Sequence, residues 1–114
     1  MTAVNEPPIE ITCLAVKDKI DTGEPFLFID CRNPDEHAQA RIEGTRLVPM
    51  NEISTRIAEF EAYREQEIVI HCHHGGRSAR VADWLREQGF AKARTMVGGI
   101  DRWAEEIDRS VPRY

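Results

Sequence analysis

The sequence predicts an α/β fold in which a mainly parallel sheet carries helices on both faces. Short apolar runs of strand length recur along the chain, and segments whose apolar residues follow the helical period lie between them. The two kinds of segment alternate, and repeated strand–helix–strand units pack as a parallel sheet that is covered on both faces. At 114 residues the chain is long enough for one such domain, which we place at 1–114.

At the N-terminal end we expect a short strand and a helix. Residues 9–12 (IEIT) have strand character, and Thr12 stands where an N-cap precedes a helix. Val16 and Ile20 are spaced for one face of that helix, and Gly23 is placed to end it.

Two strands and two helical segments are expected next. Residues 25–30 (PFLFID) form an apolar run after a proline, which is typical of a buried strand. Pro34 is suited to open a helical turn in the polar stretch that follows. Residues 46–50 (RLVPM) predict a weaker strand, and Asn51 then caps an expected helix over 52–66, where apolar residues recur with helical period.

The last part of the chain repeats the alternation. Residues 67–71 (EIVIH) predict another buried strand. Residues 78–89 place three apolar side chains on one stripe and end in a glycine, as expected of an amphipathic helix. A strand at 93–97 leads into two glycines and a helix over 100–107. In sheets of this kind the functional site lies beyond the carboxyl ends of the strands.

The charge of the chain argues against two classes of partner. The formal net charge is −5 and the sequence pI is about 5.4, with basic and acidic residues interleaved. Such a chain has no basic field that attracts nucleic acid or an anionic membrane, so neither partner is expected. The first residues carry no export leader, and no apolar run reaches the length that spans a bilayer. We expect a flexible segment over 1–8 and a cytoplasmic location.

Three cysteines in a chain without an export signal indicate reduced thiols, one of which is a candidate nucleophile. Cys72 follows the strand at 67–71 directly and opens a loop that runs to Arg77, where a helix starts. A loop around a helix N-terminus aims backbone N–H groups and the positive end of the helix dipole at its centre. That field favours thiolate over thiol and lowers the pKa of Cys72 below the free value of about 8.5. Gly75 and Gly76 are expected to allow the tight turn through positive φ.

Three motifs together resemble the rhodanese sulfurtransferase family. The loop CHHGGRS matches the family's cysteine, two variable residues, glycine, one more residue, arginine and a small residue. FLFIDCRNPDEH is similar to the family's apolar strand that ends in Asp-x-Arg with a later glutamate, and MVGGIDRW is similar to its Gly-Gly-x-x-x-Trp. The closing EIDRSVPRY resembles the tail of rhodanese domains attached to ubiquitin-activating-type adenylyltransferases. The matches span nearly the whole chain.

The resemblance implies a rhodanese-like fold with a five-stranded central sheet, and covalent sulfur transfer. Cys72 is the implied nucleophile. It takes the outer sulfur of a donor such as thiosulfate or a persulfide and passes it, as a Cys72 persulfide, to a thiol, cyanide or a sulfur-carrier protein. No cofactor and no metal is implied. The other implied site residues are His73, His74, Gly75, Gly76, Arg77 and Ser78 in the loop, with Asp30, Arg32 and Glu36 in support.

Two side chains near this loop have alternative roles. Arg77 faces the pocket mouth, or it pairs with Asp30 or Glu36 and so braces the loop. Cys31 is either an inert buried thiol or a partner of Cys72 in a relay or a protective disulfide, if the two strands are neighbours as in the resembled fold.

Three other functions are compatible with parts of the loop. A zinc nest of His71, Cys72, His73 and His74 has suitable ligand types, but adjacent residues converge poorly on one tetrahedral ion. Phosphatases and arsenate reductases of the same topology carry five residues between cysteine and arginine. This loop has four, which suits a single sulfur atom better than a tetrahedral oxyanion. The third is a module that holds a persulfide without turnover. Outside a zinc site, His73 and His74 are exposed loop tips, act as general acids or bases, or attract an anionic donor when protonated.

Overall fold

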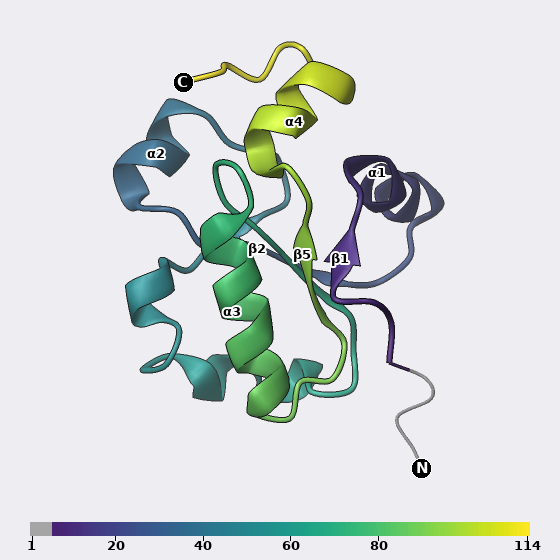
Figure 1. Cartoon of the computed structure of the whole chain (residues 1–114), viewed down its shortest axis with the longest axis vertical. Coiled ribbons are helices and arrows are strands. Elements are labelled where there is room, and N and C mark those ends of the chain that lie inside the picture. Colours follow the sequence, from purple (N-terminus) through teal and green to yellow (C-terminus); the bar gives the residue numbers. More distant parts are fainter. Residues whose placement is uncertain (1–5) are drawn as a thin grey trace.

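The computed structural model describes residues 6–114 and shows a parallel sheet with helices around it (Figure 1). In chain order the elements are β1 (Glu10–Ile11), α1 (Cys13–Thr22), β2 (Leu27–Asp30), α2 (Pro34–Gln39), β3 (Arg46–Leu47), the 3-10 segments η1 (Met50–Glu52) and η2 (Ile57–Tyr63), β4 (Ile68–His71), α3 (Gly76–Glu87), β5 (Ala93–Met96) and α4 (Gly99–Glu106). The five strands lie in the order β1-β5-β4-β2-β3, and every pair is parallel. The predicted α/β class with a five-stranded, mainly parallel sheet is confirmed.

Two helical layers cover the sheet. On one face, α3 and the 3-10 segments bury side chains such as Phe60 and Leu85 against β2 and β4. On the other face, α1 and α4 contribute Val16, Ile100 and Trp103 to a second core cluster. Figure 1 shows α2, α4 and the C-terminal segment in the upper part of the molecule, beyond the carboxyl ends of the strands, and α3 starting just below them. This is the end at which the sequence predicts the site.

Most of the predicted elements are present. All five strands occur, although several are shorter than predicted. Thr12 caps α1 as predicted, because its Oγ1 accepts a hydrogen bond from the N–H of Ala15 at 3.1 Å. Pro34 is the first residue of α2. The two helices expected after the loop and after the last strand begin slightly earlier, at Gly76 and Gly99.

The α-helix predicted over 52–66 is wrong. The chain there forms η1 and η2 with turns between them. The Thr55 hydroxyl donates to the Glu52 carbonyl at 3.0 Å, and such local bonds from Ser and Thr compete with the regular helical ladder. Ile53 and Phe60 nevertheless reach the core, at 3% and 0% exposure, so the apolar pattern still marks the buried face.

The described part of the N-terminal segment is attached to the body of the protein. The carbonyls of Pro7 and Pro8 accept hydrogen bonds from Arg86 and Arg94, at 2.7 and 2.8 Å. The rest of the segment predicted to be flexible, residues 1–5, lies outside the described residues.

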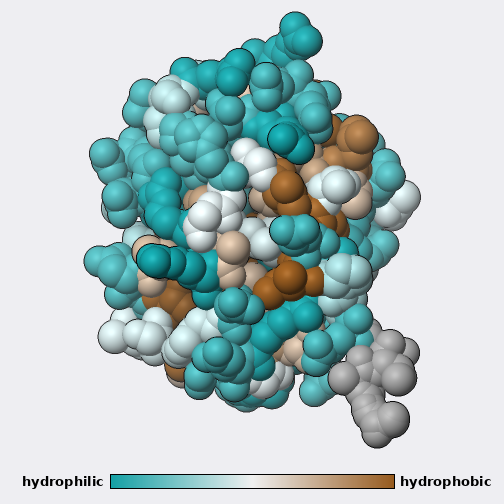
Figure 2. Space-filling model, viewed as in Figure 1, coloured by the Kyte–Doolittle hydropathy of each residue, from teal (hydrophilic) through white to brown (hydrophobic). Residues whose placement is uncertain are grey.

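The face of the molecule seen in Figure 2 is mainly hydrophilic, with apolar side chains in small separate groups. Within 6–114, the large apolar side chains that remain exposed are Leu14 and Ile20, both on α1. None of the helices described has the length and apolar character needed to cross a membrane.

Candidate active site

The ends of two neighbouring strands bring the predicted site residues together. β2 ends at Asp30 and β4 ends at His71, and these two residues are partners in the parallel register. Cys31 and Cys72 follow them on adjacent strands, and the Cys31 N–H donates to the His71 carbonyl at 3.0 Å. The sheet itself therefore sets the position of Cys72 at its carboxyl edge.

Hydrogen-bond donors surround the sulfur of Cys72. The N–H groups of Gly75 and Ser78 donate to Sγ at 3.1 and 3.3 Å, and Ser78 Oγ lies 3.5 Å away. Hydrogen bonding from Cys31 is the largest influence on the pKa of Cys72. With the Ser78 and Gly75 donors it outweighs burial and lowers that pKa to about 4. Cys72 is therefore a thiolate at neutral pH although it is only 1% exposed.

The carbonyl side of the loop lies against the start of α4. The N–H of Ile100 donates to the Cys72 carbonyl at 2.9 Å, and the N–H of Asp101 donates to the His73 carbonyl at 3.1 Å. Gly99 allows this close approach, because its φ is +60° and a Cβ there would collide with both carbonyl oxygens. These two carbonyls thus accept hydrogen bonds from the first turn of α4.

Only one of the two loop glycines has the positive φ that the sequence predicts. Gly75 has a φ of +114°. Gly76 is the first residue of α3 and has no positive φ, and a Cβ there would meet no atom within 4 Å. The prediction is wrong for Gly76 because the chain reverses at Gly75 and helical geometry begins directly after it.

The guanidinium of Arg77 braces the loop against α2. Its Nη1 and Nη2 donate to Glu36 Oε1 and Oε2 at 2.7 and 2.9 Å. These hydrogen bonds are the main cause that lowers the pKa of Glu36, to about 2. Of the orientations that the sequence leaves open, the structure has the pair with Glu36.

A buried ion pair lies at the end of β2. Arg32 donates through Nε and Nη2 to the two oxygens of Asp30, at 2.9 and 2.7 Å, and through Nη2 to the Ala40 carbonyl at 2.6 Å. Burial opposes the charge of Asp30, but the Arg32 hydrogen bonds lower its pKa to about 2. His37 Nδ1 lies 2.8 Å from the same carboxylate. The pair thus joins α2 to the strand that precedes Cys31.

The sequence did not single out two residues that reach the site. Thr95 on β5 has its Oγ1 2.7 Å from Ser78 Oγ. The Ser78 hydroxyl, which lies 3.5 Å from the Cys72 sulfur, is therefore held by Thr95. Tyr114 stacks on His73 and donates to Glu36. Strand neighbours of the loop, such as Thr95, can be found from a predicted sheet order. No local pattern indicates that residue 114 returns to the loop.

None of the three cysteines is in a disulfide. Burial raises the pKa of Cys13 to about 11, and the hydrogen bond to Cys72 is the main cause that raises the pKa of Cys31. A relay or protective disulfide between Cys31 and Cys72 stays a prediction.

Possible metal ligands occur at the outer side of the loop. His73, His74 and Asp101 each bring one donor atom to within 4.8 Å of the others. Both Asp101 oxygens accept hydrogen bonds from Arg113, at 2.9 and 3.2 Å, so a cation would compete with that arginine. The ring of His71, in contrast, is buried in the core.

Comparison with known proteins extends the match over most of the chain. The family model described as "Rhodanese-like domain" matches residues 12–106. The chain is 34% identical over 110 residues to "Adenylyltransferase and sulfurtransferase MOCS3-2" of Zea mays, which covers 91% of this chain and 23% of that protein. It is 32% identical over 95 residues to "Sulfurtransferase" of Allochromatium vinosum, which covers 83% of this chain and 87% of that protein.

A solved structure agrees with these matches. The crystal structure of a rhodanese-like domain protein from Staphylococcus aureus is similar with a TM-score of 0.79 at 27% identity, over 94% of this chain and 99% of that one. The chain spans about a quarter of the length of the maize relative but most of the Allochromatium one. The family match, the fold and the loop around Cys72 agree, and the chain therefore belongs to the rhodanese family.

Proposed function

We propose that this protein is a sulfurtransferase that carries a sulfane sulfur on Cys72. Membership in the rhodanese family and relatives named as sulfurtransferases support sulfur transfer in general. The thiosulfate donor, the persulfide on Cys72 and the roles of the loop residues are the proposed part.

The observation that carries the proposal is the environment of one sulfur atom. Cys72 Sγ accepts from two backbone N–H groups in a loop that opens α3, and its pKa is lowered to about 4, first by Cys31. A thiolate is the nucleophilic form of cysteine. Fixed N–H donors stabilise a negative charge without having to reorganise during the reaction.

The proposed reaction has two steps. The Cys72 thiolate attacks the outer sulfur of thiosulfate, a sulfur–sulfur bond forms, and the bond to the sulfonate sulfur breaks. Sulfite leaves with the electron pair of that bond, and Cys72 becomes a persulfide. Cyanide or an acceptor thiolate then attacks the outer sulfur, which leaves as thiocyanate or a new persulfide and regenerates the Cys72 thiolate. Ping-pong kinetics follow from this sequence.

The position of Arg77 favours sulfur transfer over phosphate chemistry. In phosphoryl transfer a guanidinium is aimed at the charged oxygens of the substrate. Both terminal nitrogens of Arg77 instead donate to Glu36. The small loop thus directs N–H donors at one sulfur, while its arginine binds Glu36 on α2.

We further propose a sulfur-carrier protein as one acceptor, beside small thiols. The name of the maize relative combines an adenylyltransferase with a sulfurtransferase, and the present chain matches only 23% of that protein. Three free thiols suit a reducing compartment, and we propose the cytoplasm.

Mass spectrometry of the intact protein tests the function. After incubation with thiosulfate we expect a gain of one sulfur atom that maps to Cys72, and its loss as thiocyanate when cyanide is added. The Cys72→Ser protein should do neither, whereas Cys13→Ser should do both. A persulfide that forms on Cys72 but transfers to no acceptor would identify a sulfur-holding module. Hydrolysis of an aryl phosphate without persulfide formation would overturn the proposal in favour of a phosphatase.

A further inference from the structure

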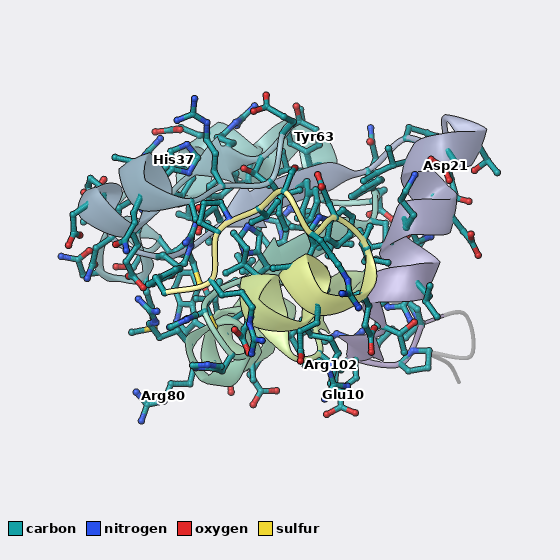
Figure 3. All side chains as sticks on the ribbon, turned by 90° about the horizontal axis from the view of Figure 1, so that it is seen from above. Glu10, Asp21, His37, Tyr63, Arg80 and Arg102 are labelled. Atoms are coloured by element: carbon teal, nitrogen blue, oxygen red, sulfur yellow. The ribbon has the colours of Figure 1, made fainter. Side chains whose placement is uncertain are left out.

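The C-terminal segment returns from α4 to the active-site loop. After α4 ends at Glu106, the chain turns and crosses toward α2 (Figures 1 and 3, yellow). Val111 is buried in the core beneath α4, and Arg113 donates to Asp101 at 2.9 and 3.2 Å. These two contacts hold the segment in place and bring Tyr114 to the side of the loop.

The hydroxyl of Tyr114 joins the two ion pairs of the site. It accepts a hydrogen bond from Arg32 Nη1 at 2.7 Å and donates to Glu36 Oε2 at 2.9 Å. Glu36 also holds Arg77 in the loop, and Arg32 also holds Asp30 at the end of β2. One hydroxyl thus connects the brace of the loop to the end of the neighbouring strand.

The ring of Tyr114 fixes the other side of the loop. It stacks on the ring of His73 with the centroids 3.9 Å apart and the planes at 6°, and His74 stacks on His73 at 3.9 Å as well. His73 Nε2 is shielded from solvent and has no hydrogen-bond partner within the described residues. Stacking, and not a hydrogen bond at this nitrogen, therefore orients the ring.

We infer that Tyr114 is a positioning residue for sulfur transfer. It fixes the conformation of the Cys72 loop because it stacks on His73 and donates a hydrogen bond to Glu36 at the same time. This inference rests on the proposed function. His73 directly follows Cys72, and Arg77 directly precedes Ser78, whose N–H donates to the sulfur. If Tyr114 is removed, both attachments loosen and the N–H donors move relative to Sγ. A misplacement of reacting groups by about 1 Å can cost roughly 100-fold in rate.

The two tyrosines of the chain offer a matched pair of variants. Tyr114→Ala removes the stack and the hydrogen bonds, whereas Tyr114→Phe keeps the stack alone. Tyr63 lies on η2, packs against the core under α3 and has Arg46 over its ring, so Tyr63→Phe makes the same chemical change away from the loop. Figure 3 labels Tyr63.

The readouts are kcat and KM with thiosulfate, melting temperature, and hydrogen exchange of the peptide that contains residues 72–78. We expect Tyr114→Ala to lower kcat by roughly 10- to 100-fold with KM changed less than about threefold, and to speed exchange in that peptide. Tyr114→Phe should retain part of the lost rate, because the stack remains. Tyr63→Phe should match the unaltered protein in all readouts.

The results separate this inference from the proposed function. If the unaltered protein transfers sulfur and Tyr114→Ala keeps its kcat and its exchange pattern, the inference is wrong while the proposed function stands, even if the melting temperature falls. If the unaltered protein forms no persulfide, the proposed function is wrong, and faster exchange in Tyr114→Ala or its absence still decides whether Tyr114 orders the loop.

Discussion

Cys72 and Cys13 are buried to the same extent, yet their surroundings give them opposite chemistry. Each residue is 1% exposed and each lies near the start of a helix. Cys72 Sγ accepts from the N–H groups of Gly75 and Ser78, and its pKa falls to about 4. Cys13 Sγ lies 3.7 and 3.9 Å from two carbonyl oxygens, those of Val97 and Gly99, and its pKa rises to about 11.

The difference shows that burial alone does not decide the reactivity of a cysteine in this fold. Burial raises the pKa of both thiols. A sulfur that faces N–H donors is stabilised as a thiolate, whereas one that faces carbonyls keeps its proton to donate it. The donors that face Cys72, with Cys31 the largest influence, outweigh burial there, whereas burial prevails at Cys13, and four changes test this difference.

The largest effect is expected from the two cysteines themselves. Cys72→Ser should reduce sulfur transfer from thiosulfate to cyanide by roughly 1,000-fold or more, because serine is not ionised at neutral pH. Cys13→Ser should leave kcat within about twofold and cost about 1 kcal/mol of stability. Steady-state kinetics and urea unfolding measure both. Comparable losses of activity in the two variants would remove the distinction.

A methyl group at Gly99 should disturb both regions, because this residue contacts both. Gly99→Ala should lower the free energy of unfolding by about 2–3 kcal/mol, since the Cβ meets the Cys72 and His73 carbonyls and the φ is +60°. Gly76→Ala is the matched control, with open space around its Cβ, and should change stability by less than about 0.5 kcal/mol. Equal unfolding curves for the two variants would show that the loop does not depend on this contact.

Cys31 is the side chain that lowers the pKa of Cys72 most, so replacing it tests the origin of the thiolate. In the unaltered protein the alkylation rate of Cys72 should stay constant down to about pH 5 and fall around pH 4, as the thiolate gains its proton. Cys31→Val should move this midpoint up by roughly one unit, the equivalent of one lost hydrogen bond. Cys31→Ala should give the same shift if the missing donor, and not the side-chain volume, is the cause. A midpoint unchanged in both variants contradicts the assignment.

The smallest effect concerns the brace of the loop. The pKa of Glu36 is about 2 in the folded protein and 4.5 as its ordinary value, so its ionised form stabilises the fold above pH 4.5. That contribution is lost as the pH falls from 4.5 toward 2, and we expect a loss of about 1 kcal/mol. Urea unfolding at pH 6 and pH 3 measures it. Glu36→Gln should lack this part of the pH dependence. Glu43→Gln, an exposed control, should retain it.

Much of the fold and part of the site could be predicted from local patterns. The apolar runs gave all five strands, and the Thr12 cap and the Pro34 turn lie where expected. The prediction of a helix over 52–66 is wrong because helical spacing of apolar residues is also compatible with 3-10 turns. In these turns a side-chain hydroxyl such as that of Thr55 donates a hydrogen bond to a backbone carbonyl. The prediction of a positive φ at Gly76 is wrong because the sequence contains two adjacent glycines and does not indicate at which one the chain reverses.

The sequence by itself determined the alternation of strands and helices, the place of Cys72 at the end of a strand and the spacing of the loop that follows it, since these depend on neighbours along the chain. Tertiary structure alone decided that Arg77 binds Glu36, that Tyr114 stacks on His73, and that α4 engages the loop carbonyls. Each of these contacts joins segments far apart in the sequence, and together they determine which groups face the sulfur. The charge of a buried thiol depends on those facing groups, so it is settled only when the chain has folded.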